Sequence, residues 1–115
     1  MANGPMDRVR AICVGLPEAY EELTWGAATF RVRKKIFAIV SDEAGVLRAS
    51  LKALREDQEA MLAQGTPFYL PPYVGAKGWI GVVLSDGAVD WQEVDELIRE
   101  SYRLVAPRRL AAEIA

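Results

Sequence analysis

The sequence has no histidine, only one cysteine and no long apolar run, and each absence excludes a class of protein. Without imidazole there is no Ser–His or Cys–His nucleophile pair and no histidine metal ligand. One cysteine cannot form an internal disulfide, a zinc ribbon or an iron–sulfur motif. No apolar run approaches the roughly 18 residues that a membrane-spanning helix needs. We therefore expect no metal, no cofactor and no membrane segment.

Length and composition predict one globular domain that covers residues 1–115. Hydrophobic residues make up 51% of the chain and charged residues 26%, which is the range of folded rather than disordered proteins. The formal net charge of -2 argues against a highly basic nucleic-acid-binding protein. The amino terminus lacks a basic segment followed by an apolar one, so we expect a soluble cytoplasmic protein. We favour a monomer.

Four strand-like segments follow one another in the first half of the chain. They cover about Tyr20–Trp25, Thr29–Arg33, Ile36–Ser41 and Val46–Leu51. The connections are too short for parallel crossovers, so these strands form an antiparallel meander. A fifth strand over Trp79–Leu84 is apolar on both sides, which predicts an interior place in the sheet.

Helical patterns precede and follow these strands. We expect helices over about Pro5–Gly15, over Leu54–Gln64, and from an Asp90 cap to Pro107, with a short tail helix after it. The single cysteine falls on the apolar stripe of the first helix and is expected in the core. Helices before and after a group of strands predict an α+β fold, with about five antiparallel strands and helices on one face of the sheet.

Positive charge is concentrated in the middle of the chain. Residues 31–55 hold seven bases and two acids, whereas residues 56–115 hold five bases and ten acids. Arg31, Arg33 and Arg48 have the outward phase of their strands, and Lys34 and Lys35 form a connecting turn. Such a basic hairpin can follow a phosphate backbone. It can equally keep an exposed sheet soluble, and both interpretations remain open.

The aromatic residues form two groups. We expect Trp25, Phe30, Phe37 and Trp79 to lie in the core because they flank or occupy strands. The proline-rich segment 66–73 contains Tyr69 and Tyr73, which either line a groove together with Trp79 or pack the loop onto the domain. Most carboxylates occupy helical surfaces, and no phosphate-binding glycine motif is present. These patterns favour a protein that is not an enzyme.

Five stretches of the sequence, in order, resemble the MmcQ/YjbR family of small bacterial proteins. They are 16–19 (LPEA), 24–32 (TWGAATFRV), 35–38 (KIFA), 73–80 (YVGAKGWI) and 100–107 (ESYRLVAP). The resemblance implies a compact α+β fold similar to CyaY or to secretion chaperones. It also implies DNA binding through a double-wing arrangement of sheet hairpins.

The family pattern can be carried over by position. The wing residues are then Arg31, Arg33, Lys34 and Lys35, with Lys77 beside the second hairpin. Many relatives have histidine where Ala27 stands, which weakens the idea of a shared catalytic or metal-binding group at that position.

Three functions remain in competition. The first is a non-enzymatic module that binds DNA weakly and largely without sequence preference. Its contacts would come from Arg31, Arg33, Lys34, Lys35, Arg48 and Lys77. The second is an adaptor that binds a protein or peptide through a sheet edge or the 66–73 loop. The third is a small-molecule site under that loop, formed by Tyr73, Lys77 and Trp79.

Overall fold

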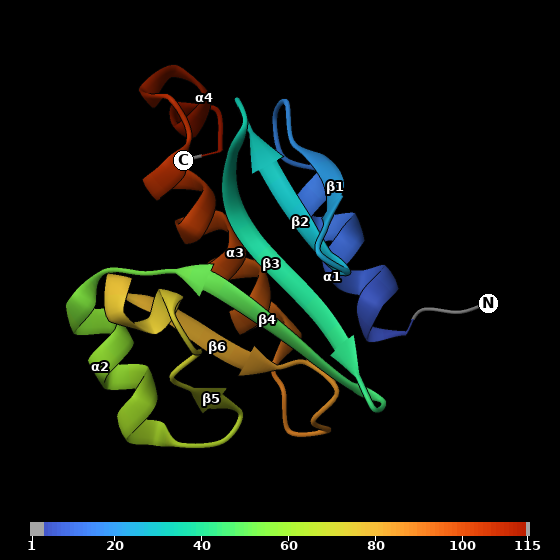
Figure 1. Cartoon of the computed structure of the whole chain (residues 1–115). Helices are drawn as coiled ribbons and strands as arrows, with labels where there is room; N and C mark the ends of the chain where they lie inside the picture. Colours follow the sequence, from blue (N-terminus) through green and yellow to red (C-terminus); the bar gives the residue numbers. More distant parts are fainter. Residues whose placement is uncertain (1–3, 115) are drawn as a thin grey trace.

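The described part of the chain, residues 4–114 of the computed structural model, has its helices and strands in the predicted order, with one short strand added (Figure 1). The helices are α1 (Pro5–Val14), α2 (Arg55–Gln64), α3 (Trp91–Val105) and α4 (Arg108–Ala112), with a 3-10 turn η1 (Val74–Lys77). The strands are β1 (Tyr20–Thr24), β2 (Ala27–Val32), β3 (Lys35–Glu43), β4 (Val46–Lys52), β5 (Phe68–Tyr69) and β6 (Trp79–Val83). The α+β fold is confirmed.

The six strands form one antiparallel sheet in the order β1-β2-β3-β4-β6-β5. The meander of the first four strands is as predicted, because their short connections allow only neighbouring antiparallel pairs. The predicted interior strand is β6, which lies between β4 and β5. The sequence analysis missed β5, which has only two residues and lies within the proline-rich segment.

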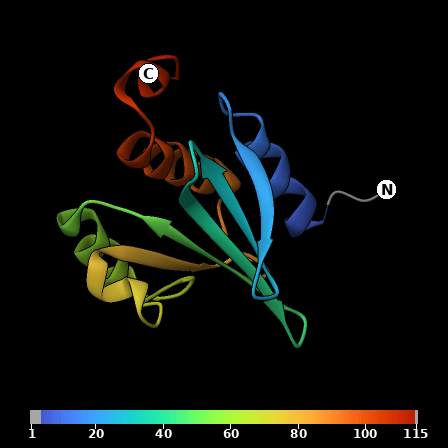
Figure 2. The ribbon, with the colours of Figure 1, turned by 45° about the horizontal axis from the view of Figure 1, so that its top comes forward.

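Helix α3 packs across β3 and β4, and α1 packs against α3 and β1 (Figure 2), so that the two helices enclose the core with the sheet. Alternate residues of the strands face these helices because side chains of a strand alternate between its two faces. One row of paired residues runs across four strands, from Phe30 through Ala38 and Leu51 to Ile80. All four side chains are completely buried. The residues that alternate with these in the four central strands therefore point to the opposite face of the sheet, which the two helices leave open.

A buried serine of α3 fixes the sheet to this helix. The pairing of β2 with β3 shifts at the position of Phe37, since Phe30 is opposite Ala38 and Arg31 is opposite Ile36. At this bulge the Ser101 hydroxyl donates to the Phe37 carbonyl over 2.6 Å. It also accepts a hydrogen bond from the Lys52 amide of β4 over 2.9 Å. One side chain thus satisfies backbone groups of two strands.

The prediction that Trp25 lies in the core is wrong. Phe30 and Phe37 are buried, but Trp25 is 99% exposed at the tip of the β1–β2 turn. Its φ is 49° and that of Gly26 is 82°, so both central residues of this tight turn are left-handed. A turn of this kind ends the strand one residue earlier than predicted and directs the side chain past the sheet. Arg33 was likewise placed in a strand but has a φ of 51° in the next turn.

Replacing Trp25 by asparagine is expected to stabilise the protein by about 1 kcal/mol, because a bulky side chain at positive φ is strained and Asn-Gly suits this turn. The exposed indole has no packing to lose. Urea unfolding monitored by circular dichroism measures the change. A loss of stability would show that the indole packs against the domain after all.

Candidate functional site

The six basic residues considered for nucleic-acid binding do not form one surface. Arg31 is half-buried and its guanidinium donates to the Thr24 hydroxyl over 3.0 Å. The same group lies 3.7 Å from the Glu22 carboxylate. The guanidinium of Arg31 therefore contacts residues of the β1–β2 hairpin. A count of charges along the sequence does not reveal these contacts.

Arg33 is also neutralised. Its guanidinium makes two hydrogen bonds to the Glu18 carboxylate, over 2.6 and 3.2 Å. These hydrogen bonds hold the pKa of Glu18 below its ordinary value. A guanidinium nitrogen of Arg109 in α4 lies 3.8 Å from the same carboxylate. Glu18 thus brings α4, which lies in the acidic half of the sequence, next to the β2–β3 turn.

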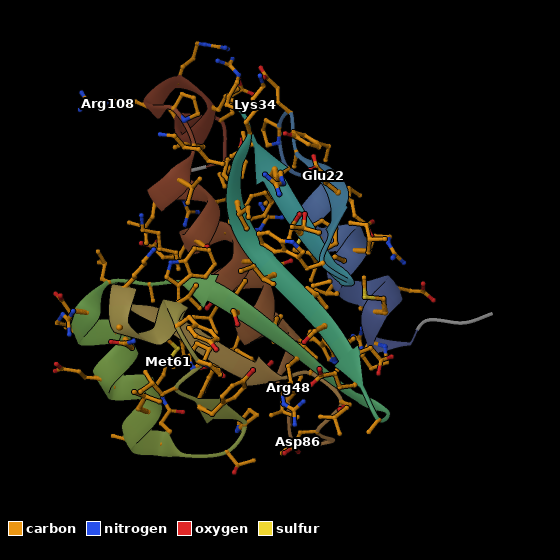
Figure 3. All side chains as sticks on the ribbon, in the orientation of Figure 1. Glu22, Lys34, Arg48, Met61, Asp86 and Arg108 are labelled. Carbon is orange, nitrogen blue, oxygen red and sulfur yellow. The ribbon has the colours of Figure 1, made fainter. Side chains whose placement is uncertain are left out.

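The remaining basic residues are separated along the sheet. Lys34 and Lys35 are exposed at the β2–β3 turn, whereas Arg48 is opposite Ser41 near the other end of β3. Six residues of extended chain separate Lys35 from Ser41, which is roughly 20 Å. Figure 3 shows Lys34 and Arg48 at opposite ends of the sheet. Lys77 ends η1, which precedes β6 on the far side of β4.

Arg48 lies instead in a groove of about 700 Å³ on the open face of the sheet. The groove is lined by Ile39, Ser41, Glu43, Arg48, Ser50 and residues 69–74. The strand register explains its floor, because Ile39, Ser50, Gly81 and Tyr69 form one row across four strands. Ser41 and Arg48 belong to the neighbouring row.

The absence of a side chain at Gly81 lets Tyr69 lie over the sheet. A Cβ atom at Gly81 would overlap with Cζ of the Tyr69 ring, so the ring occupies the space that a side chain would fill. Partial burial raises the pKa of the Tyr69 phenol, while the charge of Arg48 and a hydrogen-bonding contact with Ser50 oppose the rise. Tyr69, Ser50 and Arg48 therefore form one polar cluster at the base of the groove.

The guanidinium of Arg48 has no carboxylate partner within the described residues. The ion pairs found among residues 4–114 do not include Arg48. Its side chain is nevertheless half-buried, and Glu43 lines the same groove without reaching ion-pairing distance. A half-buried cation without an acidic partner can bind an acid group from outside the protein.

The wall of the groove is apolar and partly exposed. Leu70 is 58% exposed and Tyr73 is 94% exposed, with a φ of 66° at Tyr73. Gln58 of α2 anchors the chain after this segment, since its amide donates to the carbonyls of Gly75 and Trp79 over 2.9 Å each. The structure thus brings together two of the three predicted groove residues. Trp79, the third, is half-buried on β6 and does not line the groove.

No group of three or more acidic or cysteine side chains within residues 4–114 is placed to hold a metal ion. None of the helices of this part of the chain combines the length and the apolar character needed to cross a membrane. Burial raises the pKa of the Cys13 thiol, which lies completely buried in α1 as predicted.

Replacing Gly81 by alanine is expected to push the Tyr69 ring off the sheet and to destabilise the protein by about 1–3 kcal/mol, the usual cost of overpacking. Gly87→Ala is the matched control, because a Cβ atom there meets nothing within 4 Å. Urea unfolding gives the stability and the ring signals of Tyr69 in NMR spectra report its displacement. Equal behaviour of the two variants would contradict the packing described for Gly81.

Comparisons with known proteins agree with this fold. The model of the YjbR family matches residues 14–104. The crystal structure of Deinococcus radiodurans protein DR2400, which has the DUF419 domain, is similar with a TM-score of 0.78 and 27% sequence identity. The similarity covers 90% of this chain and 81% of that one. No curated protein matches the sequence significantly. The match over most of its length and the shared fold show that the chain belongs to the YjbR family.

Proposed function

We propose that the protein is a binding module that holds a small molecule with a flat apolar part and one acidic group in the groove on the open sheet face. The observation that carries the proposal is the half-buried Arg48 guanidinium beside Tyr69, which has no carboxylate partner among residues 4–114. The groove volume of about 700 Å³ also falls within the range of roughly 300–1,000 Å³ that small-molecule sites have.

Each part of the groove suits one part of such a ligand. A carboxylate can accept two parallel hydrogen bonds from the Arg48 fork, a geometry that arginine offers and lysine does not. The hydroxyls of Ser41 and Ser50 line the same groove and can fix its orientation. Leu70 and the ring of Tyr73 offer an apolar wall against which a flat group can pack.

Glu43 limits the charge of the ligand. Its carboxylate lines the groove that also contains Arg48, so a ligand with several negative charges is repelled there. A nucleoside diphosphate is disfavoured for this reason, whereas a monoanion can pair with Arg48 alone. An amino group elsewhere on the ligand would gain a partner in Glu43. The preferred class is therefore an aromatic monocarboxylate, with or without an amine.

The experiment measures binding of benzoate and indole-3-carboxylate, with their primary amides as uncharged counterparts. We expect the acids to bind in calorimetry and the amides to bind much more weakly. Arg48→Gln should weaken binding of the acids about 10- to 100-fold, because a charged hydrogen-bonded pair contributes about 1.5–3 kcal/mol.

Lys77→Gln is the control for charge, since Lys77 is exposed and lies outside the groove. The affinity of the Lys77→Gln variant for the acids should equal that of the unaltered protein. Equal affinity in Arg48→Gln, or equal binding of acids and amides, would rule out the proposed role of Arg48. Absence of binding by every aromatic acid tested would reject this ligand class.

A second candidate, weak nucleic-acid binding, is supported by the grouping at the β2–β3 turn. Glu18 links Arg33 to Arg109, which brings α4 to the turn, where Lys34 and Lys35 are exposed. Arg108, also exposed, adds a cation from α4. Phosphate contacts from such a cluster would be insensitive to base sequence.

Fluorescence anisotropy with a labelled duplex at several salt concentrations tests this second candidate. Each phosphate contact makes the slope of log affinity against log salt more negative by about 0.9. A double variant, Lys34→Gln with Lys35→Gln, should make this slope shallower and lower the affinity. Arg48→Gln should leave both the slope and the affinity unchanged. Binding that is absent at low salt, or that is lost in Arg48→Gln alone, would reject the cluster at the turn as a nucleic-acid site.

A further inference from the structure

Strand β1 forms one edge of the sheet, and α1 contacts it near Glu21 through Arg10. The strand pairs only with β2, and all residues from Tyr20 to Leu23 are exposed. Within residues 4–114, no backbone hydrogen bond from another segment reaches β1 apart from its ladder with β2. Such an edge presents a row of unpaired N–H and C=O groups, which is a template for another strand.

This edge lacks three of the features that usually prevent such pairing. Edge strands are commonly protected by lysine, proline or a bulge. No basic residue occurs between Arg10 and Arg31, and β1 contains no proline. The register of β1 with β2 is regular over all five pairs. No bulge therefore turns this edge away from an added strand.

Two exposed apolar side chains adjoin this edge. Leu23 is 77% exposed, and Trp25, two residues later, is 99% exposed in the strained turn described above. The fold gains no packing from either side chain. Exposed tryptophan is typical of the anchor residues that contribute most to protein–protein binding. An added strand along β1 would run directly past both.

The charges of β1 specify the kind of strand. Its only charged residues are Glu21 and Glu22. Glu21 makes two hydrogen bonds with Arg10 of α1, but Glu22 is 54% exposed and its contact with Arg31 is loose, at 3.7 Å. Glu22 and Leu23 point to opposite faces because they are neighbours in a strand. A partner with a basic residue opposite Glu22 and apolar residues toward Leu23 matches both faces.

We infer that the β1 edge is a docking site for an extended segment of another protein in which basic and apolar residues alternate. The inference is independent of the groove, because β1 and the groove-wall segment 69–74 lie at opposite edges of the sheet. A second copy of the chain fits less well. Antiparallel pairing of β1 with itself, centred on Glu22, places two glutamates directly opposite each other, which is destabilising.

The test uses the full chain and a twelve-residue peptide of alternating lysine and valine. We expect saturable NMR shifts at residues 20–25 and slower amide exchange in β1 when the peptide is added. A peptide of alternating glutamate and valine should bind at least tenfold more weakly. The lysine–valine peptide with alternate N-methylated amides should also bind at least tenfold more weakly, because it cannot complete the ladder.

Two asparagine variants separate anchoring from general damage. Trp25→Asn should weaken peptide binding about tenfold without loss of stability. Tyr73→Asn is the matched control, since Tyr73 is also almost fully exposed at positive φ but belongs to the groove wall. It should leave peptide binding unchanged, so a failure of the groove proposal does not affect this result.

Three outcomes would overturn the inference. They are equal affinity of the N-methylated peptide, equal affinity of the glutamate peptide, and shifts outside residues 20–25 only. Dimerisation of the protein through β1, detected by ultracentrifugation and abolished by Trp25→Asn, would show that the edge accepts a second copy instead.

Discussion

Replacement of Tyr102 by alanine is expected to lower the free energy of unfolding by about 3–5 kcal/mol, the range observed when a large aromatic residue is removed from a core. The Tyr102 ring is completely buried in α3. It packs edge-on against Phe37 with centroids 5.4 Å apart and planes at 86°. Its hydroxyl donates to the Pro17 carbonyl over 2.7 Å. The side chain therefore joins α3 to the sheet and to the segment before β1.

Urea unfolding measures this loss, and Tyr102→Phe divides it into its parts. The phenylalanine variant keeps the ring and its contact with Phe37 but leaves the Pro17 carbonyl without its donor. We expect it to lose only about 1 kcal/mol, which is the usual net contribution of one hydrogen bond. Since small domains are stable by about 5–15 kcal/mol, the alanine variant would approach the unfolding limit. A loss below 1 kcal/mol in Tyr102→Ala would contradict the central position assigned to the ring.

Replacement of Ser101 by alanine is expected to cost about 2–4 kcal/mol, although it removes one oxygen atom only. Two backbone groups lose their partner, the Phe37 carbonyl and the Lys52 amide. Ser101 is completely buried, so water cannot easily replace the hydroxyl. A buried polar group without a partner costs about 1–3 kcal/mol.

Ser85→Ala is the matched control for Ser101. The Ser85 hydroxyl accepts a hydrogen bond from the Leu47 amide over 3.1 Å, but Ser85 itself is exposed. Water can take its place, so we expect a loss below about 1 kcal/mol. Urea unfolding compares the two variants, and amide exchange at Lys52 reports directly on the lost bond. Equal losses would show that burial at Ser101 does not decide its contribution.

Both core residues also support the candidate groove. Strands β3 and β4 provide its floor, and α3 packs across these two strands. Ser101 bonds to both strands at the bulge, so its loss would loosen the pairing of β3 with β4, the strands that contain Ile39 and Ser50. A core variant that weakens ligand binding must therefore be compared at equal fraction folded. Arg48→Gln avoids this difficulty because Arg48 has no partner in the described residues whose loss would destabilise the fold.

Family membership defines the fold of this protein more closely than its function. The YjbR match and the Deinococcus radiodurans structure establish the arrangement of helices and strands. One fold can nevertheless carry unrelated sites on its faces and edges. Function must therefore be argued from particular groups, of which Arg48 in the groove and the exposed Trp25 are the most specific here.

The sequence by itself determined the features that depend on neighbouring residues. Alternation predicted the meander and the outward phase of Arg48, and the structure has Arg48 on the face opposite to the buried Leu47 and Ala49. The Asp90 cap was also predicted, and its carboxylate accepts hydrogen bonds from the amides of Gln92 and Glu93. These features follow from backbone geometry over a few residues, so the local pattern is sufficient.

Only the tertiary structure decided which distant residues meet. The pairing of Arg33 with Glu18 and the position of Tyr69 over Gly81 join segments that are well separated along the chain. Trp25 is exposed because a turn of two left-handed residues ends its strand early. Neither a count of charges nor the apolar character of a residue predicts these contacts. The partners that neutralise a charge or bury a side chain come from distant parts of the chain, and only the tertiary packing brings them together.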